Sequence, residues 1–169
     1  HDISQIETCD DIAPVLSGVP NNITIECDEM VPTPPAIGTE LNATDYSDDD
    51  FTIELFEEST KGQGDACTEF NFQITRTWTV TDDCDNSNVA IQTITVEDTT
   101  SPIVDNEAED LVVECDVNSN DGQLQEWLAK NANAIVTDNC GDIEWSNNFI
   151  NLSDECGSTG TSLVVFTAV

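Results

Sequence analysis

Seven cysteines and 35 acidic residues are the side chains of this 169-residue chain whose chemistry can be inferred from residue type and spacing. No two cysteines form a Cys-x-x-Cys pair, and the single histidine is His1. This pattern excludes the usual zinc sites and thioredoxin-type redox chemistry. Cysteines scattered through short β-rich segments are typical of disulfides, which persist in oxidising compartments. We therefore expect an extracellular protein, secreted or at the cell surface.

The charge of the chain is strongly one-sided. Only Lys61, Arg76 and Lys130 oppose the 35 Asp and Glu, so the formal net charge is −32. Nucleic acids and anionic lipids bind through basic patches, so neither is expected as a partner. No segment is apolar over a membrane-spanning length, so no membrane insertion is expected. Converging carboxylates favour divalent cations such as calcium.

Calcium is the one cofactor that the residue pattern suggests, although none is required. We expect a hairpin loop after Asp82 to meet Asp10 and Asp11, and Asp98 to meet loops near Asp138. The candidate ligands are Asp10, Asp11, Asp82, Asp83, Asp85, Glu97, Asp98 and Asp138. Asp also favours tight turns, so ordinary turn chemistry is the alternative at each position. Residues 116–122 resemble half of a calcium loop with its glycine misplaced, and a turn in which Asp121 caps a helix is preferred there.

No catalytic residues are expected. Neither a Gly-x-Ser-x-Gly motif nor a Cys–His arrangement occurs. A pair of carboxylates for glycoside hydrolysis could exist among so many acids, but small β-modules lack the deep cleft that this reaction needs. We therefore predict that the chain is not an enzyme.

Short alternating segments are the elements that must position these side chains. Ile23–Glu26 alternates, and residues 70–80 alternate over the length of a half-buried central strand. Residues 89–96 form the next strand, after a hairpin loop at 82–88. Trp78, Trp145 and Phe166 fall on predicted strands and are expected in the core.

One short helix interrupts this β-pattern. We predict it at residues 123–130, where Leu124, Trp127 and Leu128 share one apolar face. Trp127 is expected to pack on the neighbouring strands.

An internal repeat with an offset of 88 residues organises the chain. The offset joins Pro14 to Pro102 and Cys27 to Cys115, and Thr44 matches Thr137 further along. The predicted division is 1–11, the tail of a preceding repeat with its junction; 12–99, repeat 1; and 100–169, repeat 2. Repeat 2 lacks the counterpart of the last hairpin and strand of repeat 1.

These motifs resemble the hyalin-repeat (HYR-like) immunoglobulin superfamily, in its four-cysteine bacterial form, over nearly the whole chain. The resemblance is carried by Ala13-Pro14-Val15, Ile25-Glu26-Cys27-Asp28, Thr137-Asp138-Asn139-Cys140, and the segments 75–84 and 95–102. It implies an all-β fold of tandem immunoglobulin-like Greek-key β-sandwich repeats, with the short helix inserted in the second. Such modules occur in Bacteroidota surface proteins, often adhesins exported by the type IX system and linked to gliding motility. The chain departs from the pattern at Ser47, where a cysteine is expected.

The immunoglobulin-like arrangement suggests which cysteines pair. Cys67 and Cys84 bracket one strand of roughly 50 Å, which is too long for a disulfide between them. We predict Cys27–Cys67 and Cys115–Cys156 at one pole of each sandwich. Cys9–Cys84 would replace the bridge that Ser47 precludes, and Cys140 would bond to a residue beyond the chain. In the rival scheme Cys9, Cys84 and Cys140 are free thiols.

Glycosylation has four candidate positions. Asn22, Asn42 and Asn151 lie in Asn-x-Ser/Thr sequons. Thr99 lies in Asp98-Thr99-Thr100, which resembles the short O-glycosylation acceptor of Bacteroidota. Unmodified surface turns are the alternative at each position.

The resulting functional hypothesis is a disulfide-stabilised spacer or stalk in a long cell-surface adhesin or filament, whose partners are neighbouring repeats of the same chain. The alternative is a glycan- or protein-binding adhesion module, with calcium dependence as an option. A uniform acidic surface would favour the spacer, and an exposed apolar patch on one sheet face would favour binding.

Overall fold

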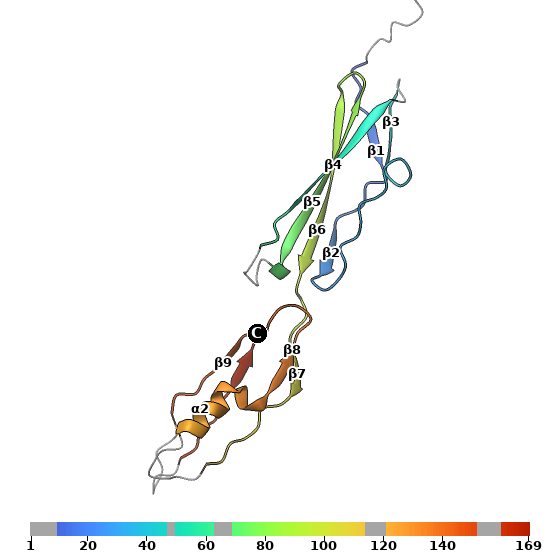
Figure 1. Ribbon diagram of the computed structural model, residues 1–169. Coiled ribbons are helices and arrows are strands. Elements are labelled where there is room, and N and C mark those ends of the chain that lie inside the picture. The colour runs from blue at the N-terminus through green and yellow to red at the C-terminus, as the bar shows by residue number, and fades with distance from the viewer. Residues whose placement is uncertain (1–9, 47–49, 63–68, 114–120, 152–159) are drawn as a thin grey trace, which may run out of the picture. The chain divides into compact units, whose positions relative to one another are not determined.

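The chain divides into two compact units, His1–Asp98 and Thr99–Val169, each described here by itself. The computed structural model describes residues 10–46, 50–62, 69–113, 121–151 and 160–169 (Figure 1). The units meet one residue before the predicted boundary between residues 99 and 100. Most of the regular elements that the structure describes are β-strands, with one short α-helix, α2, in the second unit, which confirms the all-β class.

A four-stranded sheet forms the centre of unit 1 (Figure 1). Its order is β2 (Ile23–Glu26), β6 (Ser87–Glu97), β5 (Phe72–Asp82) and β4 (Phe51–Ser59). β5 pairs antiparallel with both β4 and β6, whereas β2 and β6 run parallel. The prediction for β2 is confirmed at both ends.

The strands of the β5–β6 hairpin extend beyond the predicted ends, so that only four residues, 83–86, form the loop. The loop is short because Asp82 continues the ladder, its backbone N–H donating to the backbone oxygen of Asn86 at 3.1 Å. Along β5 every second residue from Ile74 to Asp82 is buried, which confirms the predicted half-buried central strand.

A two-stranded sheet of β1 (Val15–Ser17) and β3 (Asn42–Thr44) completes unit 1. The strands are antiparallel, with Val15 opposite Thr44. The most completely buried large side chains are those of Trp78, Val80 and Ile94 from the larger sheet, with Leu41 just before β3.

The end of β1 lies close to the turn that precedes β3. Gly18 has φ +81°, and a Cβ atom there would overlap the backbone oxygen of Glu40. That turn is closed by the carbonyl of Ala36, which accepts N–H groups from Thr39, Glu40 and Leu41. Position 18 therefore requires glycine, because its φ is positive and the Glu40 backbone oxygen leaves no room for a Cβ atom.

Unit 2 contains two pairs of antiparallel strands. β7 (Ile103–Asn106) pairs with β8 (Ile135–Thr137), and β9 (Trp145–Asn147) pairs with β10 (Phe166–Ala168). In the first pair Ile103 lies opposite Thr137. Trp145 and Phe166 are half-buried, in contrast to the fully buried Trp78 of unit 1.

The predicted helix is present as α2 (Asp121–Ala129). Its half-buried side chains are Leu124, Trp127 and Leu128, as predicted from their spacing. The Trp127 ring meets Phe166 of β10 edge-on at 5.3 Å, and its Nε1–H donates to the Glu109 backbone oxygen at 2.8 Å. The helix therefore docks on a strand of its own unit. None of the helices in the described part of the chain is long and apolar enough to cross a bilayer.

Candidate functional site at the β5–β6 hairpin

Asp82, the last residue of β5, organises the hairpin loop that the sequence marks as a candidate calcium site. Its Oδ1 accepts the backbone N–H groups of Cys84 at 2.9 Å and Asn86 at 2.8 Å, and its Oδ2 accepts the Asn86 side-chain amide at 2.9 Å. A carboxylate that accepts several local N–H groups closes a tight turn. Three hydrogen bonds within the loop therefore use most of the acceptor capacity of Asp82.

The same contacts set the pKa of Asp82. Desolvation acts to raise the pKa of this carboxyl, but hydrogen bonds from Asn86 and Cys84 act in the opposite direction. The hydrogen bonds dominate, so the pKa of Asp82 lies below its ordinary value. The hydrogen bonds of the loop therefore stabilise the ionised form of Asp82.

The segment before β1 meets this loop. The Asn86 side-chain amide donates to the backbone oxygen of Asp10 at 3.0 Å, and Asp10 Oδ1 accepts the Ile12 N–H at 2.7 Å. The predicted meeting of the hairpin with the preceding junction is therefore found for Asp10. The neighbouring candidates Asp11, Asp83 and Asp85 have exposed side chains.

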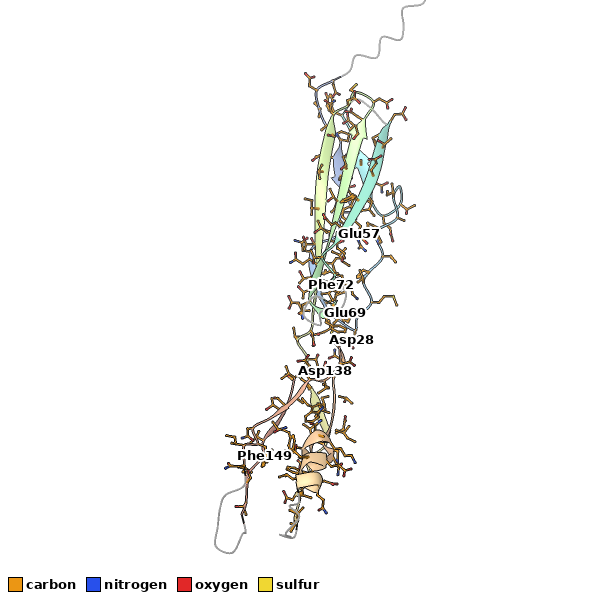
Figure 2. All side chains as sticks on the ribbon, turned by 60° about the vertical axis from the view of Figure 1, so that its left-hand side comes forward. Asp28, Glu57, Glu69, Phe72, Asp138 and Phe149 are labelled. Carbon is orange, nitrogen blue, oxygen red and sulfur yellow. The ribbon has the colours of Figure 1, made fainter. Side chains whose placement is uncertain are left out.

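Asp138 of unit 2, labelled in Figure 2, makes one of the hydrogen bonds that Asp82 makes in unit 1. Its Oδ1 accepts the backbone N–H of Cys140 at 2.9 Å, as Asp82 does for Cys84. In both units an aspartate thus closes a turn onto a cysteine two residues later. Turn chemistry, the alternative to calcium, accounts for the hydrogen bonds of both aspartates.

The remaining calcium candidates lie at the end of unit 1. Glu97 ends β6 and is half-buried. The backbone N–H of Asp98 donates to Asn71 Oδ1 at 3.3 Å. Calcium binding by any of these residues stays a prediction.

Cys27, Cys84 and Cys140 are disulfide-bonded. The rival scheme with free thiols at Cys84 and Cys140 is therefore wrong. Cys140 is bonded within this chain, which corrects the prediction of a partner beyond residue 169. That prediction rested on repeat register, whereas pairing depends on which sulfur atoms the fold brings together.

The other predicted pairs are Cys27–Cys67, Cys115–Cys156 and Cys9–Cys84. Each includes one or two of Cys9, Cys67, Cys115 and Cys156, which lie outside the described residues. Asp10, the residue after Cys9, contacts the loop that contains Cys84 through Asn86.

All four glycosylation candidates are exposed: Asn22, Asn42, Asn151 and Thr99. The Asn22 side-chain oxygen accepts the Thr93 backbone N–H at 2.8 Å, which ties this sequon to β6. Attachment of a glycan at these positions stays a prediction.

A buried polar cluster on unit 1 is the feature that sequence reasoning missed. Arg76 of β5 is 3% exposed, and its Nε–H donates to Glu57 Oε2 at 2.7 Å (Figure 2). Its guanidinium also reaches the Pro32 backbone oxygen at 2.8 Å and Gln92 Oε1 at 3.5 Å. Gln92 in turn donates to the Asn21 backbone oxygen at 2.9 Å. The cluster therefore anchors two loops to the sheet.

A signal for this cluster was available in the sequence. Arg76 stands between Ile74 and Trp78 in the alternation of β5, so it occupies an inward position. An inward arginine requires a carboxylate and further acceptors, because an unpaired buried charge is costly.

Comparison with known proteins assigns no family: the chain matches no protein-family model, and no curated protein is significantly similar to it.

Proposed function

We propose that the chain is a pair of tandem immunoglobulin-like modules that act as a disulfide-stabilised spacer in a long extracellular surface protein. One observation carries the proposal: the first strand of each unit begins its antiparallel pairing at a matching residue. Val15 lies opposite Thr44 in unit 1, and Ile103 lies opposite Thr137 in unit 2. Val15 and Ile103 differ by the repeat offset of 88 residues.

The strand order of unit 1 supports the immunoglobulin-like part of the proposal. β2 lies parallel to β6, the last strand of the unit, so two strands that are distant in the sequence are neighbours in the sheet, as in β-sandwich folds of this kind. The motif Ile25-Glu26-Cys27-Asp28 of the HYR-like resemblance spans the end of β2. We also propose calcium binding and glycosylation at the candidate residues described above.

The surface charge supports a spacer. All three Lys and Arg side chains are engaged: Arg76 with Glu57, Lys130 with Glu126 at 2.7 Å, and Lys61 above the Phe72 ring at 5.1 Å. Most of the 35 acidic residues therefore have no cation to pair with. Such a surplus keeps a chain soluble and discourages association with copies of itself.

A second function, adhesion by binding, is favoured by a separate observation. The outward face of the unit 1 sheet carries an apolar row in which Thr77 lies between Phe56 and Ile91. Phe56 is 65% and Ile91 58% exposed. An exposed apolar row of this kind can receive a glycan or a protein.

Single-molecule force spectroscopy on the full chain between handle domains tests the spacer. We expect two unfolding events, one per unit, and a longer released length after reduction. Each residue freed from a disulfide-closed loop adds about 3.5 Å. A single event whose length is unchanged by reductant would contradict the proposal.

A binding screen against surface glycans and proteins tests the second function. It compares the unmodified chain with a double variant that carries Phe56→Thr and Ile91→Thr. The control is Thr75→Ser on the same face of the sheet. If the unmodified chain and the control bind a ligand and the double variant does not, the adhesion module replaces the spacer as the proposed function.

A further inference from the structure

β4 is one of the two edge strands of the four-stranded sheet in unit 1. It has nine residues, Phe51–Ser59, and all of them pair with β5 on one side. The other edge strand, β2, has only four residues. A short edge strand limits pairing with further strands, whereas a long one presents a row of backbone donors and acceptors. β4 is therefore the edge of this sheet that can accept another strand.

Alternate backbone groups of β4 point away from the sheet. The Thr60 N–H, one residue after β4, donates to the Gln73 carbonyl of β5 at 2.9 Å. Backbone groups alternate between the two sides of an antiparallel strand, so the even-numbered residues of β4 face β5. The N–H and C=O groups of Ile53, Leu55 and Glu57 therefore face outward. Within the described part of the chain, these backbone groups make no hydrogen bond.

Three exposed side chains, Glu54, Phe56 and Glu58, alternate along the outward face of β4. The Phe56 side chain between the two glutamates is 65% exposed. Their partners across the β4–β5 ladder are outward threonines of β5, namely Thr79, Thr77 and Thr75. The sheet thus places an apolar ring between two carboxylates and provides no cation beside them.

The charge of these two glutamates is not balanced as that of Glu57 is. Glu57 lies on the opposite face of β4 and binds the buried Arg76 at 2.7 Å. Neither Glu54 nor Glu58 forms an ion pair with a described residue. Opposite charges on neighbouring strands stabilise their pairing, whereas like charges opposite each other destabilise it. Both carboxylates therefore favour a cation on the strand that would lie at the outer side of β4.

This charge pattern determines which strand fits the edge. Acidic residues outnumber Lys and Arg by 35 to 3 in this chain, so a second copy would add like charge at the edge. Repulsion of this kind excludes wrong partners while leaving the edge open to a complementary one. The complementary strand carries basic side chains opposite Glu54 and Glu58 and an apolar side chain opposite Phe56.

We propose that the β4 edge binds a basic β-strand of another protein. The strand has Lys or Arg, an apolar residue, and again Lys or Arg at alternating positions. It runs antiparallel to β4, which is the more stable orientation, and bonds the backbone of Ile53, Leu55 and Glu57. Strand addition gains affinity from main-chain hydrogen bonds and specificity from side chains. The proposal rests on the second candidate function, binding of a partner, to which it gives a chemical class.

Fluorescence anisotropy on the full chain tests the side-chain part of the proposal. The probe is the labelled peptide Thr-Lys-Thr-Val-Val-Lys-Val-Thr, whose lysines lie opposite Glu58 and Glu54 in the antiparallel register. We expect saturable binding that is weakened about three- to tenfold by the double variant Glu54→Gln and Glu58→Gln. The control double variant, Asp11→Asn and Asp83→Asn, removes the same charge at exposed positions away from β4 and should bind like the unmodified chain.

Two N-methylated probes test the main-chain bonds without changing the protein. The second valine of the peptide lies opposite Leu55, so its N–H faces β4, and its methylation should abolish binding. The first valine lies opposite Phe56, so its N–H points away from β4. Methylation at the first valine should therefore leave binding nearly unchanged.

Three outcomes of these titrations would overturn the proposal. They are no saturable binding of the probe, equal losses in the two double variants, and equal effects of the two N-methylated probes. Self-association of the chain that protects the Leu55 amide from hydrogen exchange would also overturn it, because a second copy would then be the occupant.

The variant Ile91→Thr separates this proposal from binding on the apolar row. Ile91 lies on β6, two strands away from the outer edge of β4. We expect Ile91→Thr to leave the binding of the probe unchanged. A loss in this variant would place the peptide on the face of the sheet and would contradict binding at the edge. Force spectroscopy of the spacer involves no peptide, so the spacer and the edge site can fail separately.

Discussion

At the scale of single residues, one acidic side chain shapes a loop in each unit. Asp82 and Asp138 both accept the backbone N–H of a cysteine two residues later. The hydrogen bond orders the cysteine backbone beside a disulfide-bonded sulfur. The acidic residues that suggest metal binding in the sequence thus have a structural role at these two positions.

The loop chemistry of Asp82 predicts a pH-dependent stability. Its pKa is lowered in the folded chain, so its stabilising effect is present above the ordinary pKa of aspartate, about 3.9. The effect is lost as the pH falls through the folded-state pKa. We expect Asp82→Ala to lower the urea midpoint at pH 7, by a margin that shrinks below about pH 4.

Urea titrations of both variants from pH 7 to pH 2 measure this margin. Asp83→Ala, at an exposed neighbour, is the control and should leave the midpoint nearly unchanged. A margin that persists in acid would show that the Asp82 carboxylate is not the cause.

Glu57 is the countercharge of the buried Arg76. Glu57→Gln keeps an acceptor at 2.7 Å from Nε but removes the negative charge. Because Glu57 is itself half exposed, we expect a loss of about 1–2 kcal/mol in the free energy of unfolding. Chemical denaturation measures the loss, and Glu58→Gln on the same strand controls for the general gain from removing one of many acids. Equal effects of the two changes would exclude a special role for Glu57.

At the scale of elements, local periodicity predicted α2 well because a helix buries one face at fixed spacing. The turn that follows α2 was not predicted from the sequence. Residues Asn131, Ala132 and Asn133 all have positive φ, between 51° and 60°. Asparagine tolerates this region, but Ala132 adopts it while fully buried, which reflects its tertiary surroundings.

Trp127 is expected to hold α2 on β10. Trp127→Ala removes both the ring contact with Phe166 and the hydrogen bond to Glu109, at a cost of about 2 kcal/mol for a half-buried ring. Trp127→Phe keeps the ring contact and should cost about 1 kcal/mol. Thermal unfolding followed by circular dichroism ranks the stability of the unmodified chain and the two variants. Equal losses for the two variants would mean that the hydrogen bond, and not the ring, docks the helix.

Alanine substitutions at two glycines distinguish the energetic cost of a strained backbone from the cost of a steric overlap. Gly38→Ala places a Cβ in open space at φ +85°, so it should cost about 1–2 kcal/mol from the left-handed backbone alone. Gly18→Ala adds an overlap with the Glu40 backbone oxygen and should cost at least about 2 kcal/mol more. Urea midpoints of the two variants give the comparison. Similar losses would show that the chain near Glu40 moves aside easily.

At the scale of the whole molecule, the two units differ in how completely their strands are paired. Unit 1 has a four-stranded sheet, whereas the described sheets of unit 2 have two strands each. Isolated two-stranded pairs are only marginally stable. We expect amides of unit 2 to lose hydrogen-exchange protection at lower urea than those of unit 1. A single transition shared by both units would contradict this expectation.

The sequence by itself determined the features that depend on local spacing. Alternation identified β2 and the central strand β5, and the apolar spacing of Leu124, Trp127 and Leu128 identified α2. These features are recoverable because burial of one face imposes a period on neighbouring residues.

Only the tertiary structure decided the features that depend on contacts between distant segments. The cluster of Arg76, Glu57 and Gln92 joins three strands and, through the backbone oxygens of Pro32 and Asn21, two loops. Cys140 is bonded inside the chain although the repeat register assigned its partner elsewhere. Side-chain periodicity carries no information on such pairings, because they depend on which backbone edges and sulfur atoms meet in space.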